Sequence, residues 1–155
     1  MGKFDKERKE LKKTFQGVFT SYTIDNVSWL MRRHYLDGLE YCIATGKEAD
    51  VYASRAGENT RAAKIYRIET SSFKEMRDYI DGDPRFDKVK GNKRNLVEAW
   101  CKKEHRNLSD MQDMGIRVPT PIASKKNVLI MEFIGENKKA SPTLNKTGPI
   151  NLQKE

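Results

Sequence analysis

A run of small residues between two β-forming segments is the feature that most constrains the fold of this chain. Ala44, Gly46 and Ala49 precede Val51 with the spacing small-x-small-x-x-small-x-Val. Small side chains let a chain turn tightly and let its backbone approach a ligand closely. The pattern predicts a β-hairpin, with Gly46 in a turn whose backbone N–H groups could hold phosphate.

The hairpin taken alone leaves two interpretations open. Two of its three small positions are alanine, and turns made of small residues are common in ordinary hairpins. Ala62 and Lys64 follow at the distance of a further strand, where an ammonium could contact the phosphates of ATP. The rest of the chain has to decide between an ordinary turn and an ATP-binding clamp.

Hydrophobic periodicity and turn residues predict the order of the elements. Helices are expected over 3–16, 25–38 and 95–114, and strands over 39–44, 49–55, 61–67, 121–124 and 128–133. The second helix is expected to begin at the cap Asp25 and to stop at Gly38. Together these elements predict an α+β fold, in which a five-stranded antiparallel sheet carries one long packed helix and follows two N-terminal helices.

The same pattern predicts the organisation of the chain. Residues 1–38 are expected to form a basic helical extension, and residues 39–135 the main domain. Within that domain, 69–93 lacks strand character and is expected to be a flexible loop with a short helix over 72–80. Residues 136–155 hold only isolated hydrophobic side chains, which predicts a linker or disordered tail.

Composition narrows the class of protein. With 155 residues and 37% apolar content, the chain suits one domain with a modest core. It has no apolar run of eighteen residues and no apolar N-terminal segment, so we expect a cytoplasmic protein without a membrane partner. Cys42 and Cys101 are expected to be small buried side chains. The net charge of +8 fits either an acidic partner such as RNA or simply a soluble basic surface.

One carboxylate interrupts the apolar side of the long helix. The apolar stripe comprises Val97, Trp100, Cys101, Leu108 and Met111. Glu104 falls inside this stripe, and a carboxylate that faces a core must reach solvent or meet a cation. Lys64 on the third strand is the expected partner. The alternative is that Glu104 lies at the edge of the stripe and extends to water.

Five blocks of sequence, in this order, resemble the RIO family of atypical serine/threonine kinases, and within it the Rio-one subfamily. The blocks are residues 44–51, 63–67, 82–86, 100–108 and 131–135. The resemblance covers about residues 25–136, nearly everything outside the two ends. The resemblance implies the fold of a protein-kinase N-terminal lobe, which agrees with the predicted order of strands and helices.

The resemblance also implies roles for individual residues in binding ATP. It implies that Lys64 contacts the phosphates and that Glu104 orients Lys64. The backbone that would cover the phosphates comprises Thr45, Gly46, Lys47 and Glu48. The residues that would contact adenine are Val51, Ala62 and Met131 through their side chains, and Glu132 and Ile134 through the main chain.

The sequence departs from the family in its catalytic residues. The family's catalytic loop, of the type His-x-Asp-Leu-Ser-x-x-Asn, and its later metal-binding Asp do not occur in these 155 residues. We therefore assign no catalytic or metal-binding residue, and expect Mg²⁺ ligands mainly from a C-terminal lobe that this chain lacks. His34 and His105 have no second ligand at metal-binding spacing and are expected to be structural or surface residues.

Three hypotheses for function remain. In the first, the chain is the ATP-binding half of a RIO-type kinase or ATPase in small ribosomal subunit maturation, and a separately encoded C-terminal lobe is one candidate partner. In the second, it is a non-catalytic basic module that docks on pre-ribosomal RNA or protein through its N-terminal helix and residues 88–103. In the third, it is an unstable fragment without activity.

Overall fold

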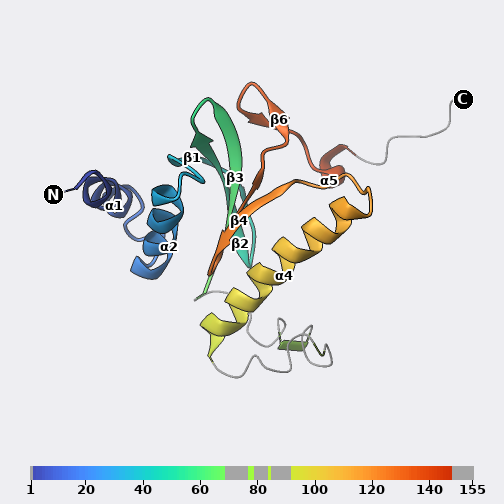
Figure 1. Ribbon diagram of the computed structural model, residues 1–155, viewed down its shortest axis with the longest axis horizontal. Helices are drawn as coiled ribbons and strands as arrows, with labels where there is room; N and C mark the ends of the chain where they lie inside the picture. Colours follow the sequence, from blue (N-terminus) through green and yellow to red (C-terminus); the bar gives the residue numbers. More distant parts are fainter. Residues whose placement is uncertain (1, 69–76, 79–83, 85–91, 148–155) are drawn as a thin grey trace, which may run out of the picture.

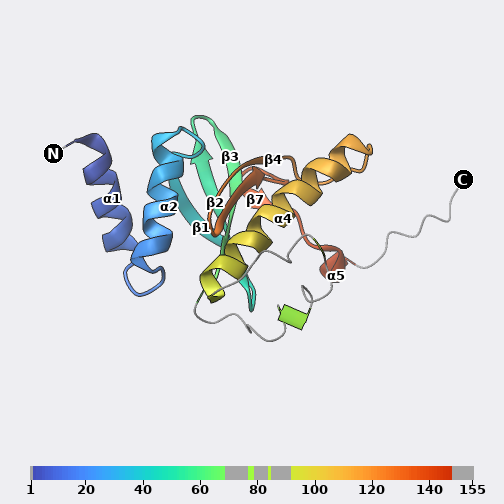
Figure 2. The same cartoon turned by 60° about the horizontal axis from the view of Figure 1, so that its bottom comes forward.

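The computed structural model describes residues 2–68, 77–78, 84 and 92–147. A five-stranded antiparallel sheet lies between helices on its two faces (Figure 1; Figure 2). The strands are β1 (Gly38–Thr45), β2 (Ala49–Ala56), β3 (Asn59–Tyr66), β4 (Pro121–Lys125) and β5 (Val128–Glu132), in the spatial order β1-β2-β3-β5-β4. The long helices are α1 (Lys3–Thr14), α2 (Ser21–Arg32) and α4 (Lys93–Asp113). The predicted α+β fold class is confirmed.

Successive side chains of each strand point to opposite faces of the sheet, so the core has two parts, one on each face. One face packs against α2, and its buried side chains include Tyr52, Ala63, Ile65, Val128 and Ile130. The other face packs against α4 through Tyr66 and Leu129. Because Lys64 lies between Ala63 and Ile65 on β3, its side chain belongs to the α4 face.

The predicted limits of α2 are wrong at both ends. The helix begins after Thr20, whose side-chain hydroxyl accepts from the Thr23 N–H at 3.4 Å, whereas Asp25 lies inside the helix and binds Arg8. The helix ends at Arg32, and His34, just beyond the C-cap residue Arg33, adopts a left-handed conformation with φ 59°. The Tyr35 N–H then donates to the Leu30 carbonyl, which is the bond that closes a Schellman motif. A non-glycine residue in this conformation leaves no clear sequence signal, and the predicted end at Gly38 is therefore wrong.

Helix α4 follows its predicted course, and four residues of the predicted apolar stripe pack in the core between α4 and the sheet: Val97, Trp100, Cys101 and Leu108. Leu96, Val97 and Cys101 are buried, while Met111 is 40% exposed and does not belong to the core stripe. The last turns of α4 extend away from the sheet (Figure 1). The predicted stripe was too long because helical periodicity does not reveal where the covering sheet ends.

The segment after β5 is more ordered than predicted. β6 (Gly135–Glu136) pairs with β7 (Lys139–Ala140), and α5 (Leu144–Thr147) follows. A Cβ on Gly135 would lie 2.2 Å from the Lys139 carbonyl oxygen, so the two strands approach this closely only with glycine there. For residues 136–147 the expectation of a featureless tail is wrong.

Most of the predicted flexible loop over 69–93, and most of the short helix over 72–80, lie outside the described residues. Among the residues that are described, no helix is long and apolar enough to span a membrane.

Candidate nucleotide-binding site

The turn between β1 and β2 forms the predicted clamp. The Gly46 N–H donates to the Ala49 carbonyl at 2.9 Å and closes the turn. A Cβ at Gly46 would lie 3.1 Å from that carbonyl oxygen, so any larger residue would press on the turn. Thr45 and Lys47 are exposed beside it, and Glu48 is partly buried. The hairpin therefore exists as predicted, while its binding of phosphate stays a prediction.

Lys64 on β3 and Glu104 on α4 form the predicted ion pair. Lys64 Nζ donates to both carboxylate oxygens of Glu104 at 2.8 Å. The two side chains are 25% and 26% exposed, so the ammonium is shielded but reachable from solvent. The Tyr66 ring centroid lies 5.1 Å from Nζ and adds a weak cation–π attraction. Of the two interpretations of Glu104, the structure selects the one in which it meets a cation.

The sheet register brings the candidate adenine residues beside Lys64. Val51 pairs with Lys64, and Ala62 pairs with Met131 on the neighbouring strand. Ala62 and Lys64 are two residues apart on β3, so they share the α4 face. Ala62 is buried, while Val51 and Met131 are partly buried. These four residues meet on one face as the sequence predicts, and their contact with adenine stays a prediction.

Glu132 and Ile134 lie at the end of β5 and just beyond it. Arg117 donates to both carboxylate oxygens of Glu132 at 2.8 Å, and the Thr120 N–H donates to one of them at 3.1 Å. These bonds hold the pKa of Glu132 below its usual range. The Ile134 carbonyl accepts from the Ser141 N–H at 2.9 Å. The sequence pattern does not predict the contact of Arg117 with Glu132, because Arg117 lies in the connection before β4, where no periodicity places its side chain.

A second missed pair anchors the clamp to β3. Arg67 donates to the two carboxylate oxygens of Asp50 at 2.9 and 2.6 Å, and the Arg67 N–H donates to the Glu48 carbonyl at 2.8 Å. The bond to Asp50 raises the pKa of Arg67 above its usual value. Opposite charges at the ends of paired strands could have predicted this contact once the register was known.

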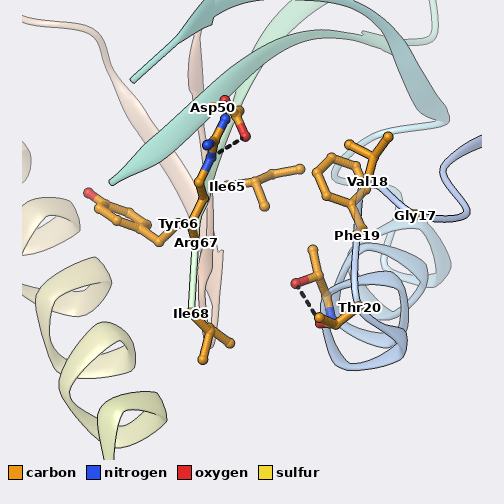
Figure 3. Close-up of a pocket in the computed structure, with 10 residues that line it drawn as sticks. Gly17, Val18, Phe19, Thr20, Asp50, Ile65, Tyr66, Arg67 and Ile68 are labelled. Carbon is orange, nitrogen blue, oxygen red and sulfur yellow. Dashed lines mark hydrogen bonds and ion pairs between the residues drawn. The ribbon is translucent and has the colours of Figure 1, made fainter. Parts of the chain in front are cut away.

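A cavity of about 420 Å³ lies elsewhere, at the connection between α1 and α2. Ile65 and Phe19 lie at this cavity, whereas the Tyr66 ring points away toward α4 (Figure 3). Because Ile65 belongs to the α2 face and Lys64 to the α4 face, the cavity and the ion pair are on opposite sides of the sheet. The cavity is therefore not part of the candidate nucleotide-binding site.

The histidines and cysteines give no metal centre in the described part of the chain, where no group of three His, Cys, Asp or Glu side chains could hold an ion. His34 is exposed at the end of α2, and His105 is partly buried on α4. Cys101 is buried, but Cys42 is exposed, with its Sγ 3.4 Å from Thr45 Oγ1. The expectation that both cysteines are buried is wrong for Cys42, because β1 is an edge strand of the sheet.

A strand lysine held by a glutamate on the helix across the sheet is the arrangement of a protein-kinase N-terminal lobe, and this class describes the present fold. A comparison with protein families then narrows the class. The RIO domain model matches residues 50–155, which is more than half of the sequence, so this chain belongs to the RIO family. The match includes residues 136–155, the segment that the sequence predicts to be a linker or tail.

Relatives of known name place the chain in the Rio1 subfamily. The RIO-type serine/threonine-protein kinase Rio1 of Haloferax volcanii is 43% identical over 138 residues, which cover 85% of this chain and 48% of that protein. The Rio1 kinase of Methanocaldococcus jannaschii is 36% identical over 152 residues, which cover 97% of this chain and 52% of that protein. The human serine/threonine-protein kinase RIO1 is 40% identical over 118 residues, with 74% and 21% covered. The chain spans about half the length of the two archaeal relatives.

Solved structures support the fold. The Rio2 kinase of Chaetomium thermophilum aligns with a TM-score of 0.57 at 18% identity, covering 75% of this chain and 34% of that one. The same kinase in its ADP/Mg²⁺-phosphoaspartate complex aligns with a TM-score of 0.58 at 16% identity, and the alignment covers 92% of this chain and 46% of that one. At this level of identity the likeness concerns the fold alone.

Proposed function

We propose that this chain is the ATP-binding half of a RIO-type serine/threonine kinase. The observation that carries the proposal is the Lys64–Glu104 ion pair, which fixes an ammonium on the sheet face shared by the candidate adenine residues. An ordinary β-hairpin protein has no need of a shielded lysine at this place. Membership of the RIO family and the kinase names of its relatives support the same assignment.

The residues present fit a nucleotide. Gly46 has no side chain that could stand between the clamp backbone and a phosphate. Ala62 is small and lies opposite Met131, which leaves room for a flat ring against the sheet. The Ile134 carbonyl is already bonded to Ser141, so the main-chain group that remains at Ile134 to meet a ring nitrogen is its N–H donor.

In this proposal each residue has a defined task. Lys64 contacts the phosphates, and Glu104 holds its ammonium in place. Bound ATP would supply the phosphoryl group, and Mg²⁺ would accompany it with protein ligands mainly from a catalytic lobe outside residues 1–155. Phosphorylation or ATP hydrolysis then requires that lobe. We propose that the kinase formed by this N-terminal lobe and a catalytic lobe acts in small ribosomal subunit maturation in the cytoplasm.

Calorimetric titration with Mg²⁺-ADP and Mg²⁺-ATP tests the proposal. Lys64→Met should weaken binding by about tenfold to a hundredfold, because a hydrogen bond to a charged group contributes about 1.5–3 kcal/mol. Glu104→Gln should weaken it less, since the ammonium remains but loses its orientation. Lys12→Met removes the same charge from an exposed position on α1 and should bind as the unchanged protein does.

The absence of nucleotide binding to the unchanged protein would contradict the proposal. If the protein binds ATP but Lys64→Met and Lys12→Met bind it with equal affinity, the assignment of the site to Lys64 is wrong.

A second candidate function is docking on pre-ribosomal RNA, and helix α1 favours it. Leu11 is the buried residue of this helix, while Lys6, Lys9 and Lys13 are exposed. Replacing these three lysines with alanine should lower the slope of log affinity against log salt by about two units for single-stranded RNA, at about 0.7 for each phosphate contact. The matched control replaces the exposed lysines Lys138, Lys139 and Lys146. If the slope falls equally in both triple variants, the effect comes from net charge alone, and docking through α1 is contradicted.

A further inference from the structure

Helix α2 is tied to helix α4 by a cluster of polar side chains. The Tyr22 hydroxyl donates to Glu98 Oε1, and Lys126 Nζ donates to Glu98 Oε2 at 2.9 Å. Arg94, one turn before Glu98, lies over the Tyr22 ring at 4.3 Å from its centroid. The three contacts join the first turn of α2, the β4–β5 turn and the N-terminal half of α4.

These contacts link elements that the sheet otherwise separates, since α2 and α4 lie on its opposite faces (Figure 1; Figure 2). The Glu98 side chain is 15% exposed, which makes its two bonds stronger than those of a surface pair. Burial opposes ionisation of Glu98, but the bonds from Tyr22 and Lys126 outweigh it and hold the pKa below its usual range. Burial, together with the bond to Glu98, raises the pKa of Tyr22.

Glu98 and Glu104 are six residues apart on one continuous helix, about 9 Å along its axis. A helix of this length moves as a rigid element, so a shift of its first turns displaces Glu104 relative to β3. The apolar anchors on the same stretch of helix, Val97 just before Glu98 and Cys101 between the two glutamates, fix the distance of α4 from the sheet. Apolar contacts are not directional, whereas the hydrogen bonds to Glu98 fix the position along the helix axis.

We infer that Tyr22 is a positioning residue of the candidate nucleotide-binding site: through Glu98 it sets the position of α4 and so holds Glu104 against Lys64. The N-terminal extension is then part of the machinery that prepares the lysine, and a partner that displaced α2 would loosen the ion pair. The affinity readout below rests on the proposed function, and the chemical readout does not.

The first experiment measures the acylation rate of Lys64 by acetic anhydride without nucleotide, followed by mass spectrometry. Lys64 Nζ is engaged by both oxygens of Glu104 and only 25% exposed, so it should react slowly in the unchanged protein. Tyr22→Phe keeps the ring over which Arg94 lies and removes only the hydroxyl. We expect it to raise the rate by about threefold to tenfold. Tyr35→Phe, at a partly buried tyrosine beyond the end of α2, is the matched control and should leave the rate unchanged.

The second experiment is a double-mutant cycle on Mg²⁺-ADP affinity. Tyr22→Phe alone should weaken binding by about threefold to tenfold, but in a Glu104→Gln background it should add less than about 1.5-fold, because the pair is already broken. A merely structural role would lower the melting temperature and act equally in both backgrounds. If Tyr22→Phe does not fold, Lys126→Met removes the other bond to Glu98 and should raise Lys64 acylation in the same direction.

Unchanged Lys64 acylation in folded Tyr22→Phe, or equal losses of affinity with and without Glu104, would overturn the inference. If the unchanged protein binds no nucleotide, the proposed function fails, while the acylation rates still decide whether Tyr22 positions Glu104.

Discussion

Three charged pairs join the elements that build the candidate site: Lys64–Glu104, Arg67–Asp50 and Arg117–Glu132, each with two hydrogen bonds. They differ in exposure. Arg117 and Glu132 are 67% and 35% exposed, so solvent screens their attraction. Asp50 is almost buried, and removing its partner would leave a carboxylate without compensation. The pairs at the clamp therefore matter more for stability than the pair beside Ile134.

The pH dependence of unfolding follows from Glu98 and Glu132. Both have a folded-state pKa below the ordinary carboxyl value of 4.5. A lowered pKa contributes stability above the unfolded-state value, and this contribution is lost as pH falls through the folded-state value. We expect the melting temperature, followed by circular dichroism, to fall steadily below pH 4.5. Arg117→Gln should flatten this acid decline, and a decline identical to that of the unchanged protein would contradict the role of the pair.

The two thiols should differ in reactivity. Burial raises the pKa of Cys101 to about 12, so little thiolate forms at pH 8. Cys42 is exposed on β1. We expect Ellman's reagent to titrate one thiol in the native protein and two in denaturant, with none in native Cys42→Ser. Fast reaction of two thiols in the native state would contradict the buried position of Cys101.

At the scale of elements, the sequence predicts those features that depend on residues close together in the chain. The strands were found to within a few residues because alternation and turn residues depend only on neighbours in sequence. Glu104 was found because a carboxylate inside an apolar stripe demands a partner. Thr20 was not found, because Thr and Asp are both common N-cap residues and the sequence does not decide between Thr20 and Asp25. His34 and Gly135 were not found either, because a left-handed non-glycine residue and a close approach of two strands depend on contacts that periodicity does not encode. Tyr22 and Glu98 meet only through the packing of α2 and α4.

Asn127, in the turn between β4 and β5, is fully buried and connects several elements. Its side chain donates to Thr23 and to the Tyr66 carbonyl at 2.9 Å and accepts from Asn26 at 3.1 Å. Asn127→Ala would remove these three buried hydrogen bonds, so we expect a loss of about 2–4 kcal/mol in the free energy of unfolding by urea. Asn107→Ala, on α4, is the control and should change stability by less than about 1 kcal/mol. Equal effects would contradict the proposed importance of this network.

At the scale of the whole molecule, the extension and the sheet share one core. Leu11, Val27 and Leu30 from residues 1–38 pack in the same cluster as Tyr52 and Ile65 from the sheet. A division of the chain at residue 38, as the sequence predicts, therefore separates elements that bury each other. The sheet itself connects this cluster with the one under α4, so the chain should unfold as a single unit.

Nucleotide binding should stabilise both faces of the sheet together. A ligand at one hundred times its dissociation constant adds about 2.7 kcal/mol, which corresponds to about 5–11 °C for a chain of this size. Trp29 packs on the α2 face and Trp100 on the α4 face, so Trp100→Phe and Trp29→Phe each leave one fluorescent reporter. With Mg²⁺-ADP we expect both reporters to shift by the same amount, and neither to shift in Lys64→Met. A shift confined to Trp100 would mean that α2 unfolds separately, and would contradict both the shared core and the tie through Tyr22.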